Sequence, residues 1–232
     1  LASNLVISDT NGKSDVFLFD RVEKLTERIS LTSEEAQIDQ DAFTRRPAIS
    51  GDGRFVVFYS NAQKLAPDDT APDTYNVYLR DRLLGETILV TNGYDDTPAN
   101  NDSLYPTLSD DGNWVAYYSL ATNLVVSDTL DSQTDVFLYS RLSQQTWRVS
   151  LAPDGSDANG SSDLPAISAD GRYVAFVSSA RNLVAGDTNG CEDIFVYDHV
   201  TGLIELVSRP TYDGLADGNS DVPSISADGR NV

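Results

Sequence analysis

One pattern recurs along the chain at intervals of 58 or 59 residues, and it constrains the fold more than any other feature. Its clearest copy runs from Leu164 to His199 and reads LPAISADGRYVAFVSSARNLVAGDTNGCEDIFVYDH. The segments PAISGDGRFVVFYS, PTLSDDGNWVAYYS and PSISADGRNV begin at Pro47, Pro106 and Pro223. Self-similarity at a fixed period of this size is typical of propellers and solenoids.

Each repeat has the pattern of four short strands joined by turns. In the clearest copy we expect strands over 165–168, 173–178, 193–197 and 204–208. Asp170 and Gly171 form the first turn, because Gly accepts the positive φ of a tight hairpin. Four antiparallel strands per repeat match one propeller blade. We therefore predict an all-β chain, a β-propeller of four-stranded antiparallel blades, with the first strand of each blade innermost.

The prolines divide a single domain, residues 1–232, into whole and partial repeats. The predicted repeats are 1–46 (partial), 47–105, 106–164, 165–222 and 223–232 (partial). The first and last repeats are cut inside a blade, which predicts a segment of a larger propeller. The alternative is a small closed ring of the nearly four repeats, because propellers have about four to eight blades.

The chain is strongly acidic, with 36 Asp and Glu against 16 Lys and Arg and a formal net charge of −20. A nucleic-acid ligand needs a basic surface, so we expect none. No apolar run reaches the roughly 18–20 residues of a membrane span, so we expect no membrane insertion. Most of the acids fall in the loops between second and third strands and between blades, which share one face. We predict that this acidic loop face takes a protein or glycan ligand.

The spacing D-x-N-G-x-x-D occurs three times and is the best candidate for a metal site. The candidate ligands are Asp9, Asn11 and Asp15; Asp157, Asn159 and Asp163; and Asp187, Asn189 and Asp193. Ca²⁺ takes about six to eight hard oxygen ligands, which loops supply from Asp, Asn and backbone carbonyls around a Gly bend. The first part resembles half of an EF-hand loop without its final Glu. The alternative is an Asx turn, and both readings stay open.

The middle repeats lack that spacing, so we do not expect a site in every blade. Asp69 is followed by Thr-Ala-Pro, and Asp128 by Thr-Leu-Asp. Ca²⁺ is thus the one cofactor that the sequence suggests, at some of these loops.

Candidate catalytic groups are few. His199 is the only histidine, and we expect it at an exposed strand end, without a Ser-His-Asp arrangement. Cys191 is the only cysteine, so there is no internal disulfide and no set of zinc ligands. Carboxylates that recur in register with the repeat are better explained by the repeat. We predict no catalytic residues, and we expect the aromatic residues that share one strand position to form core: Phe17, Tyr78, Phe137 and Phe195.

The repeat PxISxDGRxVAFxS…NLVxxDTNGxxDIFVYDxxTG resembles the PD40 repeats of TolB-like β-propellers, which are common in bacterial secreted and envelope proteins. The residues that match are Pro165, Ser168, Asp170, Gly171, Phe176, Asp187, Asp193 and Phe195. The resemblance implies an extracytoplasmic protein (periplasmic, secreted or at the cell surface) and a non-catalytic interaction or structural module, stabilised by calcium if the loops bind it. The alternative that it implies is the propeller domain of a peptidase or glycan-acting hydrolase with catalytic residues elsewhere.

Overall fold

The computed structural model describes residues 4–38, 44–67, 69, 74–126, 128, 132–212 and 214–232. Every regular element in these ranges is a strand, which confirms the all-β prediction. None of the described residues forms a helix that could cross a membrane. The strands are β1 (Phe17–Asp20), β2 (Leu25–Arg28), β3 (Thr44–Ile49), β4 (Phe55–Ser60), β5 (Asn76–Asp81), β6 (Glu86–Leu89), β7 (Ser103–Leu108), β8 (Trp114–Ser119), β9 (Asp135–Ser140), β10 (Gln145–Arg148), β11 (Ser162–Ile167), β12 (Tyr173–Ser178), β13 (Asp193–Asp198) and β14 (Leu203–Leu206).

The strands form blades, each a meander in which consecutive strands pair in antiparallel fashion. Three sheets have four strands, β3 to β6, β7 to β10 and β11 to β14, and β1 and β2 form a two-stranded sheet. By alignment with the other repeats, β1 and β2 are the third and fourth strands of a blade. The predicted four-stranded blade is therefore confirmed, in an arrangement consistent with a segment of a propeller.

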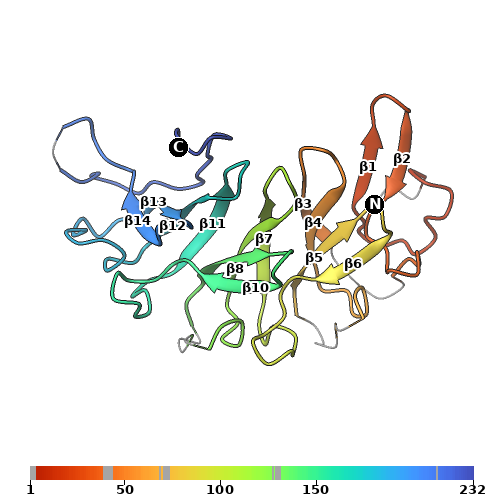
Figure 1. Ribbon diagram of the computed structural model, residues 1–232, viewed down its shortest axis with the longest axis horizontal. Coiled ribbons are helices and arrows are strands. Elements are labelled where there is room, and N and C mark those ends of the chain that lie inside the picture. The colour runs from red at the N-terminus through yellow and green to blue at the C-terminus, as the bar shows by residue number, and fades with distance from the viewer. Residues whose placement is uncertain are drawn as a thin grey trace.

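The blades lie along an open arc. Figure 1 shows β1 and β2 at one end and β13 and β14 at the other, with the two termini in opposite halves of the view. Residues 223–232 form no strand, and within the described part of the chain β1 pairs only with β2. The closed-ring alternative required this last segment to lie beside β1, and the arc does not bring them together.

The innermost strands begin three residues earlier than the sequence predicted. β11 starts at Ser162, and its register against β12 shifts between Asp163 and Ala166. Leu164, just before the proline, has a φ of 50°. Pro165 has no N–H for the ladder, so the strand continues past it only through a bulge. Treating the proline as the strand start missed the residues on the other side of that bulge.

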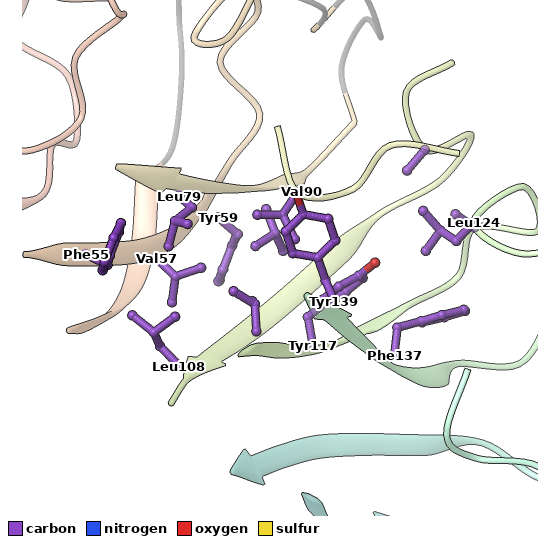
Figure 2. Close-up of a cluster of buried hydrophobic side chains, with 14 residues drawn as sticks. Phe55, Val57, Tyr59, Leu79, Val90, Leu108, Tyr117, Leu124, Phe137 and Tyr139 are labelled. Atoms are coloured by element: carbon purple, nitrogen blue, oxygen red, sulfur yellow. The ribbon is translucent and has the colours of Figure 1, made fainter. Parts of the chain in front are cut away.

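The core lies between sheets as well as within them. Of the four predicted core positions, Tyr78, Phe137 and Phe195 are fully buried, whereas Phe17, in the two-stranded sheet, is half-buried. Phe137 stacks on Tyr117 of the neighbouring strand, with ring centroids 5.7 Å apart. Figure 2 shows this pair in a cluster that also contains Val57 from the preceding blade. Burial between blades fixes each sheet against the next and holds the loops at one end of the blades in register.

The Asp-Gly hairpins dock each blade onto the one before it. The Ser168 hydroxyl donates to Asp170 at 2.6 Å and shapes the turn. Gly171 has a φ of 76°, and a Cβ there would lie 2.1 Å from Cδ1 of Trp114 in the preceding blade. Only glycine allows both this conformation and this approach. These contacts occupy the hairpin end of the blades and leave the longer loops free at the opposite end.

Candidate functional site

The loop between the second and third strands turns an aspartate inward in every repeat. These residues are Asp9, Asp69, Asp128 and Asp187, with exposed fractions of 8%, 2%, 8% and 5%. The sequence pattern groups them with the acids of the loop face, and the structure buries these four within their loops. A buried carboxylate must be hydrogen-bonded, paired with a cation or protonated, so each loop poses an electrostatic problem.

A second polar residue begins the third strand of each blade, or lies two residues before it in the first repeat, and a hydroxyl from beyond the fourth strand donates a hydrogen bond to it. The donors and acceptors are Ser30 to Asp15 at 2.6 Å, Thr91 to Asn76 at 2.8 Å, Ser150 to Asp135 at 2.5 Å, and Ser208 to Asp193 at 2.6 Å. This bond satisfies one oxygen of the acceptor. The groups that face the remaining polar atoms differ among the repeats.

In the first repeat an arginine provides the counter-charge. Arg28, at the end of β2, is buried, and its Nη2 lies 3.3 Å from Oδ1 of Asp9. Its Nε lies 3.9 Å from Oδ2 of Asp15. Gln37 accepts a further hydrogen bond from Arg28 Nη1 at 2.7 Å. The two aspartates of the first D-x-N-G-x-x-D motif therefore lie against a guanidinium.

The third repeat uses the same solution with more carboxylates. Arg148, at the end of β10, lies 2.9 Å from Asp128 and 3.3 Å from Asp135, and it also pairs with Asp157. Burial raises the pKa of Asp135, and the hydroxyl of Ser150 and the charge of Arg148 oppose that shift. One buried guanidinium thus serves several acids.

The second repeat removes one charge and adds a neutral donor. Asn76 stands where the other repeats have aspartate, and Leu89 stands where they have arginine or leucine. Tyr78 donates its hydroxyl to Oδ2 of Asp69 at 2.6 Å. Burial is the main reason that the pKa of Tyr78 is raised, and the charge of Asp69 adds to it. The hydroxyl therefore stays protonated and serves as a donor.

The fourth repeat keeps both carboxylates but has neither the arginine of the first and third repeats nor the tyrosine of the second. Leu206 takes the place of Arg28 and Arg148, and Phe195 takes the place of Tyr78. Asp193 is fully buried and accepts from Asn189 Nδ2 at 2.8 Å. Burial raises the pKa of Asp187, and the negative charge of Asp193 raises it further. Within the described part of the chain, Oδ1 of Asp187 is buried and accepts no hydrogen bond.

The structure assembles two of the three predicted ligand sets and separates the third. In the first repeat Asp9 and Asp15 both face the guanidinium of Arg28, and in the fourth the charge of Asp193 acts on Asp187 and raises its pKa. Their asparagines form Asx turns, because Asn11 accepts from Lys13 N and Asn189 from Cys191 N, both at 3.0 Å. The described residues contain no group of three or more His, Cys, Asp or Glu that could hold a metal ion. Any cation here would need amide, carbonyl and water oxygens as well.

The middle motif lies between blades and is divided among three roles. Asp157 pairs with Arg148. Asn159 accepts from Arg181 N at 2.8 Å. Asp163 lies in β11, where burial raises its pKa. Its spacing matches the other motifs, but it falls in a different type of loop.

The sequence by itself did not identify the arginines that neutralise these aspartates. Arg28 and Arg148 come from the last position of the fourth strand, where the four repeats read Arg, Leu, Arg, Leu. That alternation is visible in the sequence once the repeats are aligned. Its meaning depends on knowing that this position lies beneath the loop, which the fold alone reveals.

His199 is not the exposed strand-end residue that the sequence predicted. Its ring lies 4.5 Å from that of Trp114 and 5.2 Å from that of Trp147, measured between centroids. Burial lowers its pKa, which favours the neutral imidazole. The two tryptophans come from the neighbouring blade and cover the strand end.

Exposed acids remain at the loops that connect the blades. They are Glu34, Glu35, Asp95, Asp96, Asp154, Asp217 and Asp221. Arg209 is the only Lys or Arg in the segments 30–38, 92–102, 151–161 and 209–222. The Asp95 carboxylate accepts from the Thr97 hydroxyl at 2.6 Å, which shapes its turn without neutralising its charge. Glu35 pairs with Arg80 of β5, and the other six acids make the surface of these loops mainly negative.

No protein-family model and no curated protein sequence matches this chain. Among solved structures, TolB from Acinetobacter baumannii aligns with 93% of this chain and 41% of its own, at a TM-score of 0.50 and 16% identity. A putative TolB from Agrobacterium tumefaciens aligns with 84% of this chain and 56% of its own, at 0.50 and 18%. Dipeptidyl peptidase 4 from Porphyromonas gingivalis aligns with 86% of this chain and 30% of its own, at 0.52 and 14%.

These likenesses show the fold, a TolB-like β-propeller, and at such identities they show nothing finer. The chain spans 41% and 56% of the two TolB chains and 30% of the peptidase chain.

Proposed function

We propose that this chain is a non-catalytic interaction module, part of a β-propeller in a bacterial secreted or cell-surface protein, and that its blade-connecting loops bind a cationic segment of a protein ligand. The observation that carries the proposal is the run of exposed acids on these loops, with Arg209 as the single basic residue among them. Blades repeat the loop, so the same charge recurs at successive positions along the arc.

Charge complementarity accounts for the choice of ligand. A surface of one sign attracts a partner of the opposite sign, speeds its encounter and disfavours partners of like charge. Exposed carboxylates interact through water, so binding should weaken as salt screens them beyond about 10 Å at 0.1 M. A lysine- or arginine-rich peptide fits this surface better than a neutral glycan, which would not use the charge.

The interior groups support a module without its own chemistry. The aspartates of the hairpins are occupied in turns, as Asp170 is with Ser168, and Arg148 is surrounded by its carboxylates. His199 is packed against two indole rings, which leaves its imidazole poorly placed as a general base. The alternative, the propeller part of a peptidase or glycan hydrolase, is compatible with the same fold.

The test measures binding of an oligo-lysine peptide to the purified 232-residue chain by isothermal titration calorimetry. We expect binding at low salt that weakens at high salt, and none with an oligo-glutamate peptide. The combined variant Asp95→Asn, Asp96→Asn and Asp154→Asn should lose at least tenfold in affinity. Asparagine keeps the turn acceptors, so the fold should persist.

The matched control removes the same number of exposed charges elsewhere: Glu23→Gln, Glu86→Gln and Glu205→Gln. It should bind as the natural chain does. Equal losses in the two triple variants would show that only net charge matters, which contradicts a site on these loops. Turnover of a peptide or glycan by the chain, abolished by one carboxylate substitution, would instead favour the hydrolase alternative.

A further inference from the structure

The loop of residues 187–193 contains an electrostatic imbalance that the other three repeats have resolved. Asp187 and Asp193 are both buried, with exposed fractions of 5% and 0%. Two carboxylates that share a buried site cannot both stay ionised without a positive partner. The first and third repeats supply a guanidinium at this point, and the second supplies a phenol and replaces one aspartate by Asn76.

The residue that contacts the arginine in the first and third repeats is also different in the fourth. Gln37 accepts from Arg28, and Asp157 pairs with Arg148. By alignment, Leu215 holds this position in the fourth repeat, and it packs against the same apolar cluster as Leu206. Beneath the loop the fourth repeat thus has Leu206 and Leu215 in place of the arginine and its partner, and the hydroxyl of Ser208 donates to Asp193 alone.

One carboxylate oxygen of the Asp187–Asp193 pair receives no hydrogen bond from the described residues around it. Oδ1 of Asp187 is buried and accepts no hydrogen bond from any of them. Oδ1 of Asp9 accepts none either, but it lies 3.3 Å from the guanidinium of Arg28. Arg181 is exposed, and its charge lowers the pKa of Asp187 less than the charge of Asp193 raises it. The backbone N–H of Asn189 also favours the ionised form of Asp187, and again its effect is smaller than that of Asp193. The largest unbalanced charge of the loop therefore points at its interior.

We propose that this loop binds Ca²⁺ between the carboxylates of Asp187 and Asp193, at the position that a guanidinium occupies in the first and third repeats. The inference does not depend on the ligand proposed for the blade-connecting loops. Both carboxylates are hard oxygen donors, and the loop adds its own backbone carbonyls. With only two acids, the remaining ligands are neutral oxygens and water.

Ca²⁺ suits this loop better than its common competitors. Zinc prefers nitrogen and sulfur ligands in a tetrahedral set, and neither aspartate provides them. Magnesium demands near-octahedral geometry and dehydrates reluctantly, whereas Ca²⁺ accepts irregular sets of about six to eight oxygens. An irregular loop that supplies two carboxylates and several carbonyls matches the second requirement.

The experiment compares thermal unfolding of the full chain after EDTA treatment with and without millimolar Ca²⁺, together with calorimetric titration of Ca²⁺. A ligand that binds only the folded state stabilises it by RT ln(1 + c/Kd), where c is the free ligand concentration, so the Tm keeps rising as the ligand concentration exceeds Kd. We expect a rise of several degrees, a smaller rise with Mg²⁺, and one strong site per chain. Asp187→Asn should abolish the rise, whereas Asp9→Asn, in the loop that Arg28 neutralises, should leave it intact.

Two reciprocal variants keep the proposal falsifiable if one of them fails to fold. Leu206→Arg places a guanidinium at the site, and Phe195→Tyr places a phenol where Tyr78 has one. Either should remove most of the calcium response while raising the Tm in EDTA. An unchanged Tm and no binding heat in the natural chain would overturn the proposal and leave protonation of Asp187 as the neutralising event. A full response that persists in Asp187→Asn, or an equal response to Mg²⁺, would also overturn it.

Discussion

The loops of residues 9–15 and 187–193 both begin D-T-N-G and end in Asp, yet they resolve the same charge in different ways. Their asparagines make equivalent bonds, Asn11 to Ile38 O at 2.8 Å and Asn189 to Ala216 O at 3.3 Å. The difference comes from a residue on another strand, Arg28 beneath the first loop and Leu206 beneath the fourth. A shared local motif therefore fixes the shape of a loop and leaves its electrostatics to a distant position.

The second and third repeats extend this comparison. Arg148 repeats the solution of Arg28 with more acids, and Tyr78 shows that a neutral donor suffices when one aspartate becomes Asn76. The loop geometry is thus similar in the four repeats, and the group that faces the buried aspartate differs among the blades. Variants that exchange these solutions test the comparison directly.

The largest expected effect is that of Arg148→Leu, which gives the third repeat the residue of the fourth. Removing one partner of a buried ion pair leaves uncompensated charge and costs about 3–5 kcal/mol of unfolding free energy. Urea denaturation followed by circular dichroism measures the loss, and added Ca²⁺ should recover part of it. Arg209→Leu, at an exposed position, is the control and should change stability little. A loss below about 1 kcal/mol, as for a surface ion pair, would contradict the assigned role.

The next effect is a difference of sign between Asp9→Asn and Asp187→Asn, both measured in EDTA. Asp9→Asn weakens a charged contact with Arg28 and should lower the unfolding free energy by about 1.5–3 kcal/mol. Asp187→Asn removes repulsion from Asp193 and should raise it. Two changes of the same sign would mean that the loops are electrostatically equivalent, against the comparison drawn above.

A smaller effect is expected for Tyr78→Phe in the second repeat. The change deletes the hydroxyl that donates to Asp69 at 2.6 Å and should cost about 0.5–1.5 kcal/mol. Phe137→Tyr is a useful control, because the third repeat already has Arg148 and gains nothing from a phenol. Chemical denaturation of both variants measures their unfolding free energies. If Tyr78→Phe leaves the unfolding free energy unchanged, the phenol does not stabilise the carboxylate of Asp69.

The smallest effect contrasts these buried pairs with an Arg–Asp pair at the hairpin end of the last blade. Arg172 Nη2 lies 2.8 Å from Asp198, and both side chains are partly exposed. The hydrogen bond from Arg172 holds the pKa of Asp198 well below its ordinary value of 3.8. Its stabilising contribution is therefore complete above that value and is lost as the pH falls below it. Asp198→Asn should lower the Tm slightly at pH 7, and the difference from the natural chain should shrink towards pH 2; a difference that grows on acidification would reverse this sign.

The blade architecture could be predicted closely from the sequence, because the repeat averages out local ambiguity. Short apolar and aromatic runs and the Asp-Gly turns located β12 and β13 within a residue, and the shared aromatic position of Phe137 proved to be core. The inner strand was predicted late, because the bulge at Leu164 lets it pass a proline. His199 was misplaced because its cover comes from another blade.

The spacing D-x-N-G-x-x-D and the strand quartets are properties of neighbouring residues, and the sequence by itself determined them together with the net charge of −20. Only the tertiary structure decided which aspartates face inward and which side chains lie beside them. Charge interactions depend on distance through space, and Arg28 approaches Asp9 only once β2 has folded beside β1. The same fold puts Leu206 beneath Asp187, and so one motif became an internal ion pair and its copy a candidate cation site.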